Sequence, residues 1–527
     1  MKKIKVEKST YLDSISLMGI SKRVSETAGV KTAMVAMATD TNLLLLKESG
    51  FDLAEVKQAS ANDLLIAVDA RDGVSMEAAF ALAERAVRGE GGGAVAGGAG
   101  GEVGSGAAQG SAESVRGPIA VHGLESGLRL HPEINLVLIS VPGRFAAFEA
   151  RRALRAGRHV MIFSDNVPIE DEKALKSIAA ERGLLLMGPD CGTAMINGVG
   201  LGFANNVPRG PVGIVAASGT GAQEVSCILA RIGVGVSHII GTGGRDVSDA
   251  VGGAMTLAGL SALAHDPATQ VLVVISKLPS PAVAHEITGA AAASDKPCII
   301  YFAGSGGAAR RDSVVFARTL ADTAAAAATA CGASPRALLC EEAENERLIA
   351  DLGKRLPRSR KYVRGLYSGG TLAQEAVVLL GERLGEIATN MKMPGTELLK
   401  DPAVSKGHTV IDLGDDAFTR GRAHPMIDQA LRLARVSKEM CDPYAGVVLL
   451  DIVLGYGCNP DPAGEIARTL DDAPTGSRPI VIASICGTAG DPQGYDRQKQ
   501  MLEAADVVVA ETNASACELV VRLLGRR

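Results

Sequence analysis

The chain has no tryptophan and few other aromatic residues, and its nine cysteines follow no pattern typical of a bonded framework. The number of cysteines is odd, no C-x-x-C pair occurs, and no cysteines and histidines cluster at the spacing of metal ligands. These absences argue against a disulfide-stapled secreted domain and against a structural zinc site. We therefore expect reduced thiols, a cytoplasmic location and no bound metal.

Long apolar runs and concentrated basic charge are also missing. No run of 18 apolar residues occurs, and the basic start of the sequence lacks the apolar segment of an export signal. The formal net charge is −5 and the lysines and arginines are scattered, which does not suit a nucleic-acid surface. The sequence therefore predicts neither a membrane nor a nucleic acid as a partner.

Small and aliphatic residues are abundant instead: 47% of the 527 residues are hydrophobic and 62 are glycine. A chain of this length exceeds one hydrophobic core and predicts several domains. Short apolar runs alternate with amphipathic runs from about residue 117 onward, which predicts parallel sheets with right-handed helical crossovers. The predicted organisation is a small α/β domain at 1–88, a Gly/Ala-rich linker at 89–116, an α/β domain at 117–210, a second at 211–330, a helical connector at 331–360 and a third α/β domain at 361–527.

One turn stands out because it occurs twice. The apolar run Val212 to Ala216 leads into Ser218-Gly219-Thr220-Gly221 and a helix that carries Glu224, and a near copy reads Ser368-Gly369-Gly370-Thr371 with Glu375. The free N–H groups and the positive dipole end at a helix start suit a phosphate or carboxylate. We predict two equivalent helix starts that face a common ligand and bind phosphate, with both glutamates catalytic. Each glutamate has an alternative interpretation as a first-turn acid that stabilises its own helix.

Two further strand ends carry residues suited to a substrate, because open α/β sheets bind ligands at the carboxyl ends of their strands. Asp190 and Cys191 follow the apolar run Leu184 to Met187, and Gly243-Gly244-Arg245 follow the run Val236 to Gly241. We predict that these five residues bind the substrate, with Arg245 as a clamp for an oxyanion. The alternatives are a buried thiol at Cys191 and a solvated Arg245 paired with a neighbouring aspartate.

The stretch 361–527 repeats the order of features in 211–330. Val410 to Leu413 corresponds to the strand before Gly243, and the apolar runs Val447 to Val453 and Ile480 to Ser484 also end in Gly-rich or polar turns. His424 is the histidine best placed for a site, although a position before a proline is also typical of a helix entry. The repetition predicts two α/β domains of the same kind.

Several of these motifs resemble known families. Gly188-Pro189-Asp190-Cys191-Gly192, Gly213 to Thr220 with Glu224, and Gly241-Thr242-Gly243-Gly244 resemble the α-chain of succinyl-CoA synthetase and related NDP-forming acyl-CoA synthetases. The stretch 361–527 resembles the ligase domain of the β-chain. Over nearly the whole chain, the order of features is similar to the FdrA family, including Phe163-Ser164-Asp165-Asn166.

The resemblance implies a Rossmann-like, CoA-binding-type domain at 117–210 and two flavodoxin-like ligase domains with parallel sheets, at 211–330 and 361–527. It also implies chemistry on an acyl phosphate. FdrA proteins are associated with allantoin catabolism and are thought to act with separate partner subunits as oxamate carbamoyltransferase, which converts oxalurate and phosphate into oxamate and carbamoyl phosphate. We therefore expect a small-molecule substrate, phosphate as co-substrate, and partner subunits.

Three departures from the synthetases shape this expectation. The loop at 304–310 has no histidine to carry a phosphoryl group, a low-complexity linker replaces the glycine-rich start of the CoA-binding domain, and the ATP-grasp half is absent. Direct phosphorolysis suits these departures better than ligation, so we expect no ATP use and no certain cofactor, with CoA binding left open. Two alternatives stay open: an acyl-CoA ligase that keeps CoA, and a non-catalytic scaffold subunit.

Overall fold

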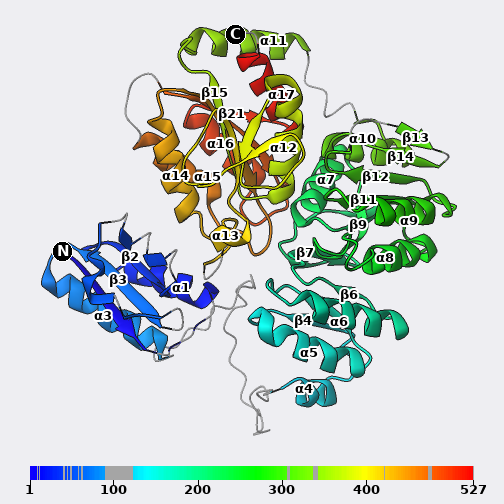
Figure 1. Ribbon diagram of the computed structural model, residues 1–527, viewed down its shortest axis with the longest axis horizontal. Coiled ribbons are helices and arrows are strands. Elements are labelled where there is room, and N and C mark those ends of the chain that lie inside the picture. Colours follow the sequence, from blue (N-terminus) through cyan, green and yellow to red (C-terminus); the bar gives the residue numbers. More distant parts are fainter. Residues whose placement is uncertain are drawn as a thin grey trace, which may run out of the picture. The chain divides into compact units, whose positions relative to one another are not determined.

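The computed structural model divides into two compact units, one of residues 1–132 with 416–423 and one of residues 133–415 with 424–527 (Figure 1). The residues described are 1–8, 10, 12, 14–39, 42–43, 46–47, 50–56, 58–60, 63–88, 123–305, 309–311, 313–335, 342–419, 422–472 and 478–525. The predicted linker 89–116 lies outside them. Within these residues, no helix is long and apolar enough to cross a membrane.

The first unit contains a three-stranded antiparallel sheet in the order β1-β3-β2. Its elements are β1 (Lys2–Glu7), α1 (Ser14–Ser25), β2 (Val30–Met37), the 3-10 turn η1 (Leu53–Val56), β3 (Leu64–Ala70), α3 (Gly73–Val87), α4 (Leu124–Leu130) and α13 (Asp416–Thr419). The central strand β3 is buried because α1 and α3 pack on one face and apolar residues between Leu46 and Val56 cover the other. The predicted small α/β domain is confirmed, and β1 is a strand that the sequence does not predict.

The second unit begins with a three-stranded parallel sheet in the order β4-β5-β6. Its elements are β4 (Leu136–Ile139), α5 (Gly143–Arg155), β5 (His159–Ile162), α6 (Ile169–Glu181) and β6 (Leu186–Met187). Helix α5 buries Ala146, Ala150 and Ala153, a spacing of three and four residues that places them on one face. Strands and helices thus alternate here as the sequence predicts.

The first ligase-type domain is built on an eight-stranded sheet in the order β13-β14-β12-β11-β9-β10-β7-β8. Its elements are β7 (Thr193–Ile196), β8 (Val199–Gly202), β9 (Arg209–Ala216), α7 (Gly219–Ile232), β10 (Val236–Gly241), α8 (Ala254–His265), β11 (Val271–Ser276), α9 (Pro281–Ala292), β12 (Cys298–Phe302), β13 (Ala309–Arg311), β14 (Val314–Phe316) and α10 (Leu320–Ala330). Strands β14 to β10 of this order are parallel, and antiparallel strands extend both edges. Residues 306–308 of the loop 304–310 lie outside the described residues.

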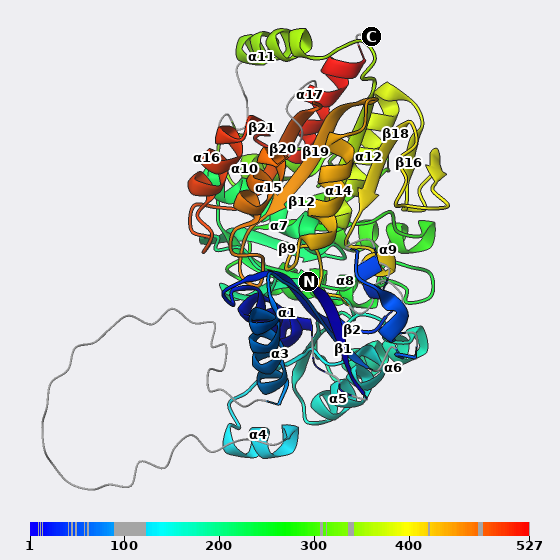
Figure 2. The ribbon, with the colours of Figure 1, turned by 90° about the vertical axis from the view of Figure 1, so that its left-hand side faces the viewer.

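The second ligase-type domain is built on a seven-stranded parallel sheet in the order β17-β16-β18-β15-β19-β20-β21, which Figure 2 shows with its strands side by side. Its elements are β15 (Tyr362–Tyr367), α12 (Gly370–Leu384), β16 (Ile387–Thr389), β17 (Thr396–Leu398), β18 (His408–Asp412), α14 (Ala430–Met440), β19 (Ala445–Val453), α15 (Pro462–Asp471), β20 (Ile480–Cys486), α16 (Tyr495–Ala504), β21 (Val507–Ala510) and α17 (Asn513–Leu524). Helix α11 (Glu342–Arg355) precedes it, within the predicted connector.

The two ligase-type domains share one strand order. The first strand, β9 or β15, has β10 or β18 on one side, and the next three parallel strands, β11, β12 and β14 or β19, β20 and β21, follow on the other side. This is the flavodoxin-like order, in which ligands bind where the chain switches direction along the sheet. In the second domain β16 and β17, which precede β18 in the sequence, extend the sheet beyond β18. The predicted pair of flavodoxin-like domains is confirmed, and so is the predicted correspondence of β18 with β10.

The two domains also share one hydrophobic core. Helix α12 packs against both α7 and α17, and α10 packs against α7. Buried apolar residues from all four helices, among them Val225, Ala324, Leu372 and Val520, belong to one continuous cluster. The helix starts of α7 and α12, which carry the duplicated turns, are therefore held in a fixed relation by the core itself.

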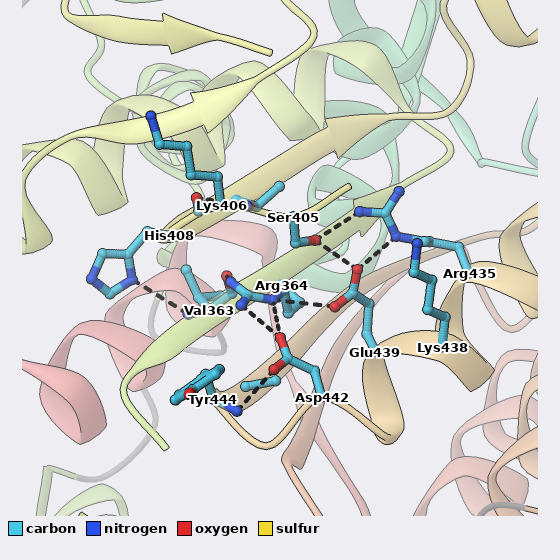
Figure 3. Close-up of polar contacts among 12 residues, drawn as sticks. Val363, Arg364, Ser405, Lys406, His408, Arg435, Lys438, Glu439, Asp442 and Tyr444 are labelled. Atoms are coloured by element: carbon cyan, nitrogen blue, oxygen red, sulfur yellow. Dashed lines mark hydrogen bonds and ion pairs between the residues drawn. The ribbon is translucent and has the colours of Figure 1, made fainter. Parts of the chain in front are cut away.

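A buried ionic cluster fixes the amino ends of the strands in the second domain (Figure 3). Arg364 of β15 pairs with Asp442 (2.6 Å) and with Glu439 (3.2 Å), and Glu439 also pairs with Arg435 (2.6 Å) and accepts a hydrogen bond from the Ser405 hydroxyl (2.6 Å). Each buried charge thus has an opposite charge beside it, as burial demands. The cluster ties α14 to the loop before β18, at the end of the sheet away from the duplicated turn.

Candidate functional site

The first duplicated turn opens α7 directly after the buried strand β9. Ser218 is the N-cap, in an extended conformation, and its hydroxyl accepts a hydrogen bond from the Gly221 N–H (3.1 Å). The N–H groups of Gly219 and Thr220, the first two residues of the helix, have no hydrogen-bond partner among the described residues, and both residues are half-buried. Two donors at the positive end of a helix thus stay available to an anion.

The second duplicated turn opens α12 in a different way. The fully buried carboxylate of Asp451 accepts hydrogen bonds from the N–H groups of Ser368 (2.9 Å) and Gly369 (2.7 Å) and from the Ser368 hydroxyl (3.1 Å), and it pairs with Arg432 (2.8 Å). A buried carboxylate needs such donors because water cannot reach it. At α12 an internal carboxylate thus occupies the N–H groups of Ser368 and Gly369, which precede the helix, so these two predicted donors are not available to phosphate. The N–H groups of Gly370 and Thr371, which correspond to those of Gly219 and Thr220, have no hydrogen-bond partner among the described residues.

The two turns meet. The hydroxyl oxygens of Ser218 and Thr371 lie 2.5 Å apart. A Cβ atom built on Gly369 would lie 3.0 Å from Cγ2 of Thr220, and one built on Gly221 would lie 3.2 Å from Cγ2 of Thr371. The glycines permit this approach because they carry no side chain there. The predicted convergence of the two helix starts is confirmed.

Glu224 and Glu375 do not point at this meeting place. Glu224 of α7 accepts a hydrogen bond from the N–H of Asn513 (3.3 Å), the first residue of α17, and Glu375 of α12 accepts one from the N–H of Leu320 (2.7 Å), the first residue of α10. Each carboxylate thus caps a helix of the other domain, where the dipole favours negative charge. The Asn513 side-chain amide also donates to Glu375 (2.8 Å).

Burial changes the acidity of both glutamates, which are each 2% exposed. Desolvation raises the pKa of Glu375 to about 7, against the opposing effect of the hydrogen bonds from Leu320 and Asn513. Desolvation also raises the pKa of Glu224, and the positive charge of Arg231 opposes that rise. Through these contacts both glutamates are part of the interface between the two domains. This position favours a structural role over the predicted catalytic one.

The residues predicted to bind substrate at the Gly188-Pro189 turn divide into exposed and buried ones. Asp190 is exposed with a φ of +56°, whereas Cys191 is 2% exposed and its thiol lies 3.5 Å from the Thr193 carbonyl oxygen. Desolvation raises the pKa of the Cys191 thiol to about 12. The structure thus agrees with the alternative of a buried thiol. Gly243, with a φ of +81°, allows the loop after β10 to pass close to this turn. A Cβ atom built at Gly243 would lie only 2.1 Å from the Pro189 carbonyl oxygen.

Arg245 is engaged in an ionic network between α6 and the loop after β10. Its guanidinium lies 2.8 Å from the buried carboxylate of Glu172 and donates to the Val167 carbonyl oxygen (2.8 Å). Lys176, also buried, bridges Glu172 and Asp246 at 2.8 Å each. These contacts fit neither alternative in full: Arg245 pairs with an acid, but with one on α6 instead of a neighbour in its own turn.

Two side chains near the helix starts, Asp412 and Lys277, were not among the predicted site residues, and His424, which the sequence singles out as a possible site histidine, lies beside Asp412. Oδ2 of Asp412 lies 2.7 Å from the position of a Cβ on Gly370, the first residue of α12. Nζ of Lys277 lies 3.7 Å from the corresponding position on Gly244. The sequence could have indicated Asp412 and Lys277 by their position, because Asp412 ends β18 and Lys277 directly follows β11. Ligands bind at the carboxyl ends of the strands in such sheets.

His424 completes this cluster. A Cβ built on Gly414 would lie 2.7 Å from Nε2 of His424 and 3.2 Å from Oδ1 of Asp412. Desolvation lowers the pKa of His424 to about 4, although nearby Asp451 and Asp165 oppose this. Its Nδ1 accepts a hydrogen bond from the Met426 N–H (3.2 Å), so the neutral ring carries its proton on Nε2.

A small cavity of about 190 Å³ lies at the carboxyl end of β19. Its lining residues are Gly455, Tyr456, Gly457, Cys458, Pro460, Pro492 and Gln493. Phe203 lies next to the cavity, because a Cβ on Gly457 would approach its ring to 3.3 Å, and the Phe203 ring centroid lies 5.7 Å from that of His424. The cavity is thus adjacent to the cluster around the helix starts and separated from it by two rings.

The strand order and the meeting helix starts define a chain with two paired flavodoxin-like domains. A family model described as CoA-ligase matches residues 366–523, and a model described as "AllF, heavy metal-associated domain" matches residues 1–101. The chain is 40% identical over 519 residues to the uncharacterized protein YahF of Escherichia coli strain K12, covering 97% of this chain and 96% of YahF. The chain therefore belongs to the FdrA family of succinyl-CoA synthetase-like proteins.

More distant relatives cover only part of the molecule. The chain is 27% identical over 181 residues to the mitochondrial subunit alpha-2 of the ADP-forming succinate–CoA ligase of Trichomonas vaginalis, covering 33% of this chain and 57% of that subunit. A solved dinucleotide-forming acetyl-coenzyme A synthetase 1 of Ca. Korarchaeum cryptofilum covers 74% of this chain and 82% of its own, at 16% identity and a TM-score of 0.28. A TM-score this low does not establish a common overall arrangement.

The description of the N-terminal match implies a metal-binding domain, but the residues do not fit a heavy metal. Residues 1–101 contain no cysteine and no histidine, the thiolate and imidazole ligands of heavy-metal sites, and methionine is the one soft ligand type present. In the part of the chain that the structure describes, no three His, Cys, Asp or Glu side chains are placed to hold a metal ion. The match at 1–101 shows a likeness of sequence to that family model.

Proposed function

We propose that the chain is an FdrA-like subunit of an oxamate carbamoyltransferase-type enzyme in allantoin catabolism. In this reaction phosphate cleaves oxalurate to oxamate and carbamoyl phosphate. The match of residues 1–101 to an AllF model and the family membership support the pathway. The proposal includes separate partner subunits, which the naming of the ligase relatives as subunits supports. It also includes a cytoplasmic location.

The observation that carries the proposal is the open helix start of α7 beside that of α12. The free N–H groups of Gly219 and Thr220 offer two donors to a phosphate, and the hydroxyl pair Ser218–Thr371, at 2.5 Å, holds the two helix starts together. Donors fixed in advance at a dipole end stabilise charge on a transferring group without reorganisation. Phosphate bound at α7 would meet the carbamoyl carbon of a substrate placed toward α12.

An acyl-CoA ligase is the second candidate, because a CoA-ligase model matches residues 366–523 and the distant relatives are CoA ligases. It requires a CoA site and a phosphoryl carrier. Gly123 caps α4, a helix that buries none of its residues, so the described residues do not supply the packed glycine-rich helix start of a dinucleotide site. A scaffold subunit that holds its partners without catalysis is the third candidate.

Ligand-dependent thermal unfolding tests the phosphate site on the chain alone. We expect phosphate or carbamoyl phosphate to raise the melting temperature and CoA and ATP not to do so; a ligand at about 100 times its Kd adds about 2.7 kcal/mol. Gly219→Val should abolish the rise, because a Cβ at this position would lie 3.0 Å from Oγ1 of Thr193, and the branched side chain would displace the turn that holds the free N–H groups. Gly289→Val is the matched control, since a Cβ there meets nothing within 4 Å.

The transferase activity itself is tested by co-expression with the products of the neighbouring reading frames. We expect phosphate-dependent consumption of oxalurate and formation of carbamoyl phosphate. CoA-dependent release of ADP would instead establish the ligase. No turnover and no anion-dependent stabilisation, with partners present, would leave the scaffold.

A further inference from the structure

We propose that Asp412 is the catalytic residue that transfers the proton in the carbamoyl-transfer step, with Lys277 of the other ligase-type domain controlling its charge. This inference rests on the proposed function, because it assigns the acid and base of that same reaction. It replaces the role that the sequence predicts for Glu224 and Glu375.

The geometry places one carboxylate oxygen of Asp412 at the reaction site. Oδ1 accepts a hydrogen bond from the Gly414 N–H (2.9 Å), which fixes the carboxylate. Oδ2 has no hydrogen-bond partner among the described residues and lies over Gly370, 2.7 Å from the position a Cβ would take. The first residue of α12 thus has a free carboxylate oxygen beside it, next to the turn that meets α7.

Three other carboxylates close to the helix starts are already engaged. Asp451 accepts from two backbone N–H groups and from Arg432, Glu224 caps α17, and Glu375 caps α10. A proton-transferring group needs an oxygen that reaches the substrate. Among these four acids, Asp412 alone presents such an oxygen.

The charges around Asp412 set its acidity near neutrality. Desolvation raises the pKa of Asp412 to about 7, and the negative charges of Asp415 and Asp451 add to the rise. The positive charge of Lys277 and the Gly414 N–H oppose it. His424 faces the same glycine through Nε2 and adds no charge at pH 7, because burial lowers its pKa to about 4. A carboxyl with a pKa close to the working pH suits both giving and taking a proton.

The step balances with one proton passing through Asp412. An oxygen of hydrogen phosphate attacks the carbamoyl carbon of oxalurate, the C–O bond forms, and the bond from that carbon to the oxamate nitrogen breaks. The protonated Asp412 gives its proton to the departing nitrogen, which yields the neutral amide of oxamate. The carboxylate then takes the proton of the phosphate hydroxyl, which leaves carbamoyl phosphate as the dianion and restores the acid.

Enzyme assays on the co-expressed complex, with oxalurate and inorganic phosphate, test this assignment. We expect Asp412→Asn to lower kcat by about 100-fold or more, with little change in the KM for phosphate. Wild-type kcat should fall as pH rises through about 7, because the acid loses its proton. Lys277→Met should move this fall to higher pH, since removal of the positive charge raises the pKa of Asp412.

If Asp412 has only a structural role, Asp412→Asn changes stability, and Lys277→Met does not move the pH profile of kcat. The Lys277→Met profile therefore separates a structural from a catalytic role even if Asp412→Asn folds poorly. An active wild type with Asp412→Asn within threefold of it, or a Lys277→Met profile that coincides with the wild-type profile, would overturn the assignment and leave the proposed function standing. A wild-type complex that does not cleave oxalurate would overturn the proposed function and this assignment together.

Discussion

Replacement of Glu375 by glutamine should make the stability of the protein less sensitive to pH. Glu375 is 2% exposed, and burial raises its pKa from the usual 4.5 to about 7. The folded protein therefore binds this proton more tightly than the unfolded chain does. The contribution of the proton to stability is complete below pH 4.5 and is lost as pH rises through 7.

The size of the effect follows from the same values. Each pKa unit is about 1.4 kcal/mol, so the rise from 4.5 to about 7 is worth about 3 kcal/mol between pH 4 and pH 9. Glutamine keeps an oxygen for the Leu320 N–H but turns its own NH₂ toward the amide donor of Asn513, which costs about 1 kcal/mol. Glu375→Gln should thus be the less stable protein at pH 5 and the more stable one at pH 9.

Urea unfolding of both proteins at pH 5, 7 and 9 measures this crossover. Glu382→Gln on the same helix is the control, because Glu382 is 42% exposed and pairs with Arg318 at the surface, where an ion pair contributes little. A difference between wild type and Glu375→Gln that stays constant from pH 5 to pH 9 would refute the reasoning.

Two further substitutions test the packing of the helix starts. Asp451→Asn should cost about 3–5 kcal/mol in urea unfolding, because it leaves the buried Arg432 without its opposite charge; a loss below 1 kcal/mol would contradict the role given to this pair. Gly221→Ala should cost about 1–3 kcal/mol, since the new methyl would lie 2.5 Å from the Ser218 hydroxyl oxygen and 2.8 Å from Cγ2 of Ile275. Gly289→Ala meets nothing within 4 Å and is its control, so equal stability of the two alanine variants would refute the close approach.

The sequence predicts the parts of this molecule that depend on local pattern. Apolar runs and amphipathic runs place the strands and helices, and the repeated turns before α7 and α12 indicate the duplicated domain and the convergence of its helix starts. Such patterns act over one strand, one turn and one helix, so spacing along the chain is enough to detect them.

The side chains that contact the helix starts come from positions far away in the sequence. Asp451 reaches the α12 turn from a neighbouring strand, 83 residues beyond Ser368, and Glu224 caps a helix start 289 residues away. Asp412 and Lys277 come from different sheets. No local pattern encodes such pairs, because strand order and domain packing bring them together, and the sequence therefore does not show which acids contact helix starts of the other domain.

The reciprocal caps also bear on how the chain is made. Ribosomes deliver domains in order, and an early domain usually folds before a later one appears. Here Glu375 caps α10, and Glu224 has its partner on α17, the helix synthesised after all other elements of both domains. Until the second domain is made, the start of α10 has only the Thr319 side chain as its cap, and the first ligase-type domain has only its own half of the shared core. A nascent chain with that much exposed apolar surface is a natural client for chaperones, until α17 leaves the ribosome and closes the interface.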